Sequence, residues 1–158
     1  MIAIHHVSLD NQKEIVELMK KKYSFRTVQQ AEQALFDEYN QGHHFRAAWD
    51  GEKIVGLISW RPQGEIYHGV AELTRLAVLS DYHDPRAVKE LMFDVMIAEA
   101  DDFYHSHGSH LRKIFSMIHA DARHVREFFV DKGLQQEAVL KNHFHPNKDE
   151  LVFSMFLS

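Results

Sequence analysis

The first forty residues contain one short alternating segment and two stretches whose apolar positions repeat at helical spacing. Ile2–Val7 alternates loosely between apolar and polar residues, which predicts a short strand. Asp10 or Asn11 is suited to cap the helix that follows. Thr27 is a favourable N-cap for a second helix, which ends at Gly42. The side chains predicted to face inward are Ile15, Leu18, Met19 and Tyr23 in the first helix, and Val28, Ala31, Leu35 and Tyr39 in the second.

Two strands joined by a tight turn come next. The segment His44–Trp60 consists of two apolar runs separated by Asp50-Gly51, a dipeptide typical of hairpin turns. The following segment, Glu65–Leu79, is long for one strand, so we expect a β-bulge near Gly69. The chain therefore adds a hairpin and a third strand to the sheet.

The second half of the chain alternates between helices and strands. Asp84-Pro85 is typical of a helix start, and the helix it opens is expected to end near Gly108. The apolar positions of this helix are Val88, Leu91, Met92, Val95 and Met96. We then expect a strand at Lys113–His119, a helix at Ala122–Lys132 that ends at Gly133, and strands near 136–140 and 151–157. Because antiparallel neighbours are combined with a strand-helix-strand crossover, the predicted fold class is α/β with a mixed sheet.

Composition limits the kind of protein that carries this fold. A chain of 158 residues with 45% apolar residues is expected to form one domain with a substantial core. Its net charge of -5 and its lack of a basic block argue against a nucleic-acid or membrane-surface protein and favour a small partner. The sequence has no cysteine, which excludes disulfides, thiolate metal ligands and a cysteine nucleophile. No segment has the pattern of a signal peptide or a membrane span, so we expect a cytoplasmic location by default.

The segment LAVLSDYHDPRAVKELM, from Leu76 to Met92, runs from an apolar strand through a polar loop into an amphipathic helix. It resembles the signature of the GNAT superfamily of N-acetyltransferases, in which an Arg/Gln-x-x-Gly-x-Gly/Ala loop holds the pyrophosphate of acetyl coenzyme A (acetyl-CoA). His83 stands at the Arg/Gln position, and Arg86 and Val88 stand at the last two small-residue positions. The strand and the helix match this signature, whereas the loop lacks its glycines.

A second segment carries the same resemblance. FFVDKGL, from Phe128 to Leu134, is similar to the family's Phe-Tyr-x-x-x-Gly-Phe pattern, with Phe129 at the tyrosine position and Gly133 at the glycine position. The order of elements extends the resemblance to nearly the whole chain. It implies a single GNAT-like acetyltransferase domain over residues 1–158, with a mostly antiparallel mixed sheet flanked by about four helices. The implied reaction moves an acetyl group from acetyl-CoA to an amine of a small molecule or peptide; a homodimer is left open.

The resemblance places the coenzyme against the loop and the strand before it. The cofactor-binding residues that it implies are Leu76, Val78, His83, Asp84, Arg86, Ala87, Val88 and Lys89. Backbone N–H groups at a helix start bind anions, but Pro85 has no N–H, and the Asp84 carboxylate caps these donors and repels phosphate. His83, Arg86 and Lys89 can supply positive charge around the same turn. We therefore expect side chains to replace part of the backbone phosphate site; the alternative is that this segment is only a well-capped helix start.

Direct transfer to an amine needs an oxyanion donor and a base. The resemblance assigns the first role to the backbone N–H of Val78. Glu72 lies six residues earlier, on the same face of a regular strand, and is the candidate base. The alternative is that Glu72 faces solvent or pairs with Arg75 or Arg61.

The departing thiolate also takes up a proton, which the family's tyrosine often supplies. Phe129 has no hydroxyl, so His124 is the candidate acid, with Tyr82 or water as alternatives.

The sequence leaves two other function classes open. The glycine-free loop and Phe129 favour a catalytically inactive GNAT-fold module that senses a ligand or binds a protein. The thirteen histidines raise the second class, a histidine-dependent metal protein, through the clusters His105, His107, His110 and His143, His145. Zinc sites usually add a carboxylate or thiolate ligand, so no metal is expected.

Overall fold

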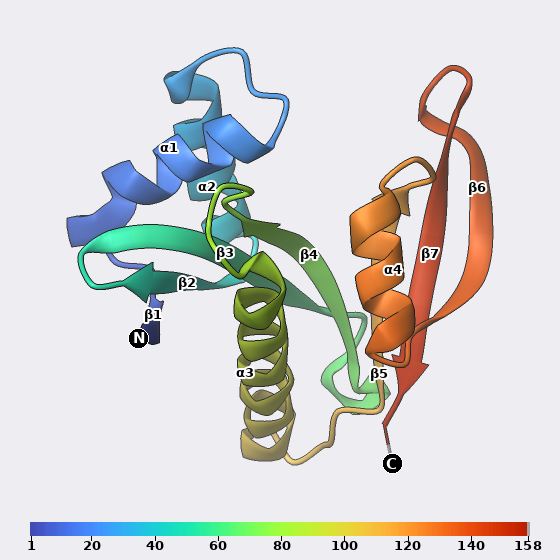
Figure 1. Ribbon diagram of the computed structural model, residues 1–158. Helices are drawn as coiled ribbons and strands as arrows, with labels where there is room; N and C mark the ends of the chain where they lie inside the picture. The colour runs from blue at the N-terminus through green and yellow to red at the C-terminus, as the bar shows by residue number, and fades with distance from the viewer. Residues whose placement is uncertain (158) are drawn as a thin grey trace. The chain divides into compact units, whose positions relative to one another are not determined.

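The computed structural model describes residues 1–157, with the side chain of Leu9 excepted (Figure 1). The elements are β1 (Ile2–His6), α1 (Gln12–Lys22), α2 (Val28–Asn40), β2 (His44–Asp50), β3 (Lys53–Gln63), β4 (Val70–Val78), α3 (Pro85–Ser106), β5 (Lys113–His119), α4 (Arg123–Asp131), β6 (Gln135–His145) and β7 (Lys148–Phe156). One seven-stranded sheet has the order β1-β2-β3-β4-β5-β7-β6. Four of its pairs, β1–β2, β2–β3, β5–β7 and β6–β7, are antiparallel, and β4–β5 is parallel. The predicted α/β class, with four helices and a mostly antiparallel sheet, is confirmed.

The chain divides into two compact units. Unit 1 consists of Met1–Arg61 and Arg75–Asp102, and unit 2 consists of Pro62–Thr74 and Phe103–Ser158. None of the described helices has the length and apolarity that a bilayer crossing requires.

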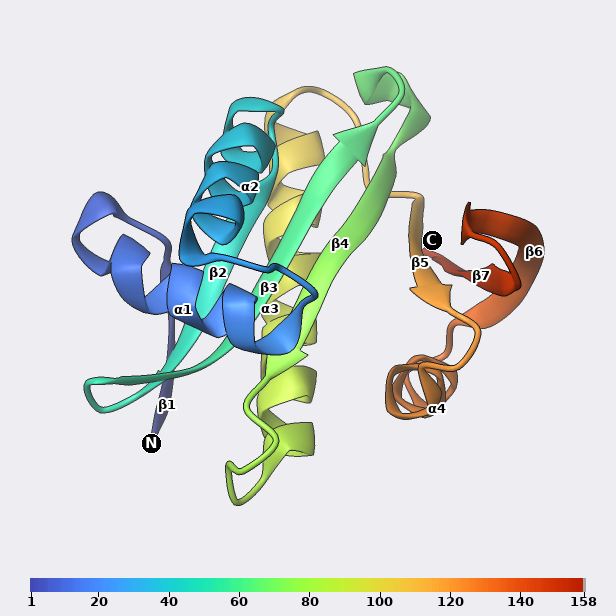
Figure 2. The same cartoon turned by 90° about the horizontal axis from the view of Figure 1, so that it is seen from above.

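In unit 1, α1 and α2 cover one face of β2 and β3, and α3 covers the other (Figures 1 and 2). The predicted cap of α2 is confirmed, because the Thr27 hydroxyl accepts a hydrogen bond from the N–H of Gln30 at 3.1 Å. A glycine at position 56 lets α3 approach β3 closely, since a Cβ there would lie 2.9 Å from Cε of Met92. The core between the first two helices and the strands includes Ile15, Leu18, Met19, Ala31, Leu35, Phe45, Ala47 and Leu57.

In unit 2, α4 contributes aromatic side chains to a second apolar cluster. The Phe129 ring is buried, and its centroid lies 6.1 Å from that of Phe153 on β7. The parallel register of β4 and β5 covers Val70–Glu72. β6 is an edge strand that pairs with β7, and most of its side chains are exposed.

The strand predicted for Glu65–Leu79 is wrong in its first part. Ile66–His68 forms a single 3-10 turn, and Gly69, with φ of 63°, ends that turn instead of forming a bulge. A Cβ on Gly69 would lie 2.2 Å from the carbonyl oxygen of His110. The Gly69 carbonyl in turn accepts the N–H of Arg112 at 2.7 Å. The turn itself is closed by local hydrogen bonds, because the N–H of Glu65 donates to Nδ1 of His68 at 2.9 Å and the N–H of Gly69 donates to the carbonyl oxygen of Ile66 at 3.2 Å.

Three apolar side chains predicted to face inward are exposed instead. Val28, Tyr39 and Leu91 are 41%, 66% and 40% exposed. The surface that each helix buries is thus narrower than its apolar stripe. The last two strands are longer than predicted, because polar residues pair in the β6–β7 hairpin without an apolar periodicity to reveal them.

Candidate active site

The loop between β4 and α3 is fixed by the sheet and by a side chain. The N–H of Leu79 donates to the carbonyl oxygen of Val55 on β3 at 2.9 Å, one residue beyond the end of β4. The hydroxyl of Tyr82 donates to Oδ2 of Asp50, the last residue of β2, at 3.0 Å. This bond is the main reason that the pKa of Asp50 is lowered. The glycine-free loop is therefore anchored at both of these points.

The first turn of α3 has few backbone donors to offer an anion. Pro85 has no N–H, and Oδ1 of Asp84 accepts the N–H of Ala87 at 3.2 Å, which confirms the predicted cap. Val88 is buried in the core at 1% exposure. An anion at this turn would therefore depend largely on side chains.

Three cationic side chains gather near this turn. The pKa of Lys89 is lowered, first by partial burial and then by the positive charges of Lys22 and Arg86. Arg86 donates from Nε to Glu90 at 3.2 Å, one turn along α3. The positive charges of Lys22, Arg86 and Lys89 are compatible with an anionic ligand, beside the carboxylates of Asp84 and Glu90. The sequence does not identify Lys22 as a site residue. The run of lysines at the end of α1 is visible there, but only the tertiary structure brings Lys22 near Lys89 on α3.

The edge of β4 offers backbone hydrogen bonds beyond the residues that pair with β5. The N–H of Leu76 donates to the hydroxyl of Tyr23 at 3.1 Å. Since the N–H of Leu79 points toward β3, alternation along the strand directs the N–H groups of Leu76 and Val78 to the opposite edge. This edge is therefore suited to hydrogen-bond an extended ligand.

A partly buried ion pair adjoins that edge. Arg75 donates from Nε and Nη2 to the two carboxylate oxygens of Glu38 on α2, each at 2.8 Å. The Arg75 guanidinium lies 4.5 Å from the centroid of the Tyr23 ring. Nδ1 of His43 lies 3.9 Å from Oε1 of Glu38. The sequence pattern places Tyr23 only on an apolar helix face, because its polar partners are far away along the chain.

The two predicted catalytic side chains belong to unit 2. Glu72 is 5% exposed and accepts a hydrogen bond from Nε2 of Gln63 at 2.6 Å, so the solvent-facing alternative is wrong. Arg75 pairs with Glu38 instead of Glu72, and the pairing of Glu72 with Arg61 stays a prediction. His124 is exposed in the first turn of α4. Their roles stay predictions.

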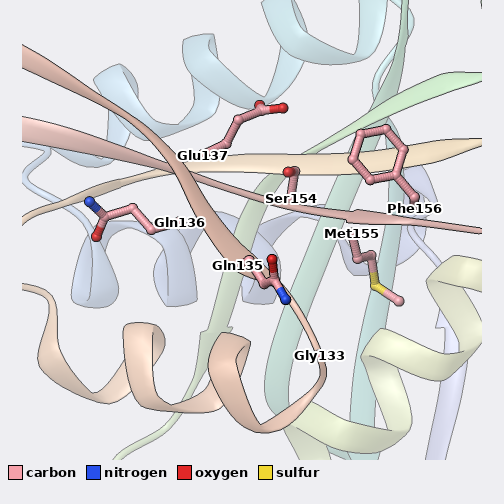
Figure 3. A pocket seen from close by; sticks show the side chains of 7 residues that line it. All are labelled: Gly133, Gln135, Gln136, Glu137, Ser154, Met155 and Phe156. Atoms are coloured by element: carbon pink, nitrogen blue, oxygen red, sulfur yellow. The ribbon is translucent and has the colours of Figure 1, made fainter.

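Unit 2 also has an open groove beside the start of β6 (Figure 3). It is lined by Gly133, Gln135, Gln136, Glu137, Ser154, Met155 and Phe156. None of the predicted site residues lines it. Among the residues that the structure describes, no group of three or more histidine and carboxylate side chains is arranged to hold a metal ion.

Comparison with protein families decides the assignment. Residues 13–124 match the model of the acetyltransferase (GNAT) family. The chain belongs to the GNAT acetyltransferase family. The match extends from α1 to the start of α4 and includes the β4 edge, the glycine-free loop and the first turn of α3. The sequence resemblance is confirmed, and the protein is assigned to a family of acyltransferase enzymes.

Solved structures show the GNAT fold over the whole chain. The aminoglycoside 6'-N-acetyltransferase from Enterococcus faecium is 16% identical, with a TM-score of 0.77 over 98% of this chain and 96% of that one. A ribosomal-protein alanine N-acetyltransferase from Escherichia coli is 11% identical, with a TM-score of 0.79 over 100% and 95%. The spermidine/spermine N-acetyltransferase SpeG from Vibrio cholerae is 13% identical, with a TM-score of 0.73 over 99% and 95%. The comparison with curated protein sequences finds no match.

Proposed function

We propose that this GNAT protein transfers an acetyl group from acetyl-CoA to an amine. The observation that carries the proposal is one continuous stretch, Leu76–Lys89, in which a strand edge, whose Leu76 amide bonds only a side-chain hydroxyl, leads into a cationic helix start. Pantetheine is an extended chain with amide groups and suits the strand edge. The pyrophosphate suits the cations.

The proposed reaction uses the residues of this chain in named roles. Arg86, Lys89 and His83, with Lys22, hold the phosphates, and the backbone N–H of Val78 polarises the thioester carbonyl. The amine nitrogen attacks the carbonyl carbon, the carbon–sulfur bond breaks, and coenzyme A (CoA) leaves as a thiolate. Glu72 accepts the proton from the amine, and His124 supplies one to the thiolate.

The acceptor is proposed only as an amine. The names of the three similar enzymes refer to an aminoglycoside, a ribosomal-protein alanine and spermidine or spermine, which are chemically diverse amines. A small-molecule or peptide amine is therefore proposed for this chain. The cytoplasmic location stays a prediction from the sequence.

Substitution of Arg86 tests the phosphate site. Calorimetry with acetyl-CoA is expected to show binding by the parent protein that weakens as salt is added, because charged side chains make the contact. Arg86→Ala is expected to weaken binding by about 1 to 3 kcal/mol, the value of a charge-assisted hydrogen bond.

A matched control exists in α4. Arg123 also stands in a first helical turn and donates to a glutamate four residues on, Glu127, at 2.9 Å. Arg123→Ala should leave acetyl-CoA affinity unchanged. Equal affinities for Arg86→Ala and the parent would refute the phosphate assignment.

One observation favours an inactive, ligand-binding protein as the second candidate function. Phe129 is 1% exposed and has no hydroxyl to give the thiolate. Thiol release from acetyl-CoA, followed over a panel of polyamines, aminoglycosides and peptides, separates the two candidates. Binding without amine-dependent release across that panel would support the inactive module, whereas amine-dependent release supports transfer.

A further inference from the structure

The side chain of Tyr23 places its phenol oxygen against the edge of β4. Tyr23 follows the last residue of α1, and its own N–H donates to the carbonyl of Met19 at 2.9 Å, which fixes its backbone to the helix. Its side chain reaches β4, where the phenol oxygen accepts the N–H of Leu76 at 3.1 Å. A backbone amide at this edge is therefore already bonded to an oxygen that does not come from a neighbouring strand.

The surroundings keep this oxygen in place. The Arg75 guanidinium stacks 4.5 Å from the Tyr23 ring centroid and 5.5 Å from that of Phe25. Arg75 is itself held by two hydrogen bonds to Glu38. Burial raises the pKa of Tyr23, against the opposing charge of Arg75, so the phenol is neutral near pH 7. The Leu76 amide thus faces a neutral oxygen acceptor, the same kind of group as a thioester carbonyl.

We propose that Tyr23 occupies, in the free protein, the position where the acetyl oxygen of the coenzyme binds, and so controls how well the protein distinguishes acetyl-CoA from CoA. The inference rests on the proposed function and changes one part of it: the thioester oxygen accepts from the N–H of Leu76, and the N–H of Val78, about 7 Å further along the same edge, is left to the pantetheine chain. An acetyl carbonyl must displace the phenol oxygen from the Leu76 amide. The free thiol of CoA has no carbonyl at that place and binds without this competition.

Tyr23→Phe removes the competing oxygen and keeps the ring that Arg75 covers. Calorimetry is expected to show that this variant binds acetyl-CoA about fivefold more tightly than the parent does, the equivalent of one net hydrogen bond. Its affinity for CoA should stay within about twofold of the parent's, because CoA leaves the Leu76 amide unused. The ratio of the two affinities is the measured quantity, and no acceptor amine is needed.

Tyr39→Phe is the matched control, since it removes a hydroxyl from an exposed tyrosine on α2. Its affinity ratio should equal that of the parent. If acetyl-CoA and CoA affinities in Tyr23→Phe change by the same factor, or neither changes, the inference is wrong while the proposed coenzyme site stands. If the parent binds neither ligand, the proposed function fails and the inference with it.

Discussion

Glu72→Gln is expected to lower acetyl transfer about a hundredfold at pH values below the pKa of the acceptor amine, and much less above it. A general base contributes at least this factor while the amine is protonated, and the free amine at high pH no longer needs a base. Initial rates of thiol release across the pH range, with an acceptor found in the amine panel, measure the effect. Acetyl-CoA affinity should be nearly unchanged, because the proposed phosphate contacts lie elsewhere in the sequence.

The structure makes this substitution a fair test of the carboxylate. Glu72 is buried and accepts from Gln63 at 2.6 Å, and a glutamine can accept the same bond through its amide oxygen. Glu52→Gln, in the exposed β2–β3 turn, is the control and should not alter the pH profile. A loss that is independent of pH, or no loss, would reject Glu72 and direct the search for the base to a histidine or an ordered water.

Gly69→Ala is expected to destabilise the protein by about 3 kcal/mol, among the larger effects of a single substitution. Two costs combine at this residue. Its φ of 63° is strained for any side chain, and the new Cβ would lie 2.2 Å from a backbone oxygen of His110, which cannot rotate away. Chemical denaturation of the parent and the variant measures the difference in the free energy of unfolding.

Gly108→Ala separates the two costs. Gly108 has a φ of 77°, but nothing lies within 4 Å of the position of its Cβ. This control carries the backbone strain alone and should lose about 1 kcal/mol. Similar losses for the two variants would show that the close approach at the start of β4 does not contribute.

Local signals predicted much of the fold. The Thr27 and Asp84 caps and the Asp50-Gly51 turn are confirmed, because each depends on hydrogen bonds or dihedral angles within a few residues. The turn before Gly69 was predicted as strand, although its own hydrogen bonds are local: Glu65 donates to His68 and Gly69 donates to Ile66. The apolar pattern of residues 65–79 does not distinguish such a turn from the start of a strand, and the contact of Gly69 with His110 is 41 positions away along the chain.

In the candidate site, too, features set by neighbouring residues were predicted and contacts between distant residues were not. The strand, loop and helix that carry residues 76–89 were found from their own pattern, which the family match includes. Tyr23 was not found as a site residue, because its partner Leu76 is 53 positions away. The anchoring of the loop by Tyr82 was missed for a similar reason, since Asp50 lies 32 positions earlier.

Amide chemical shifts of the isotopically labelled protein, recorded during a titration with acetyl-CoA, test most directly where the coenzyme binds. The largest shifts are expected at the amides of Leu76, Val78 and the first turn of α3. Shifts concentrated on the groove around Gln135 and Ser154 instead, or no shifts at millimolar acetyl-CoA, would contradict a coenzyme site at the β4 edge.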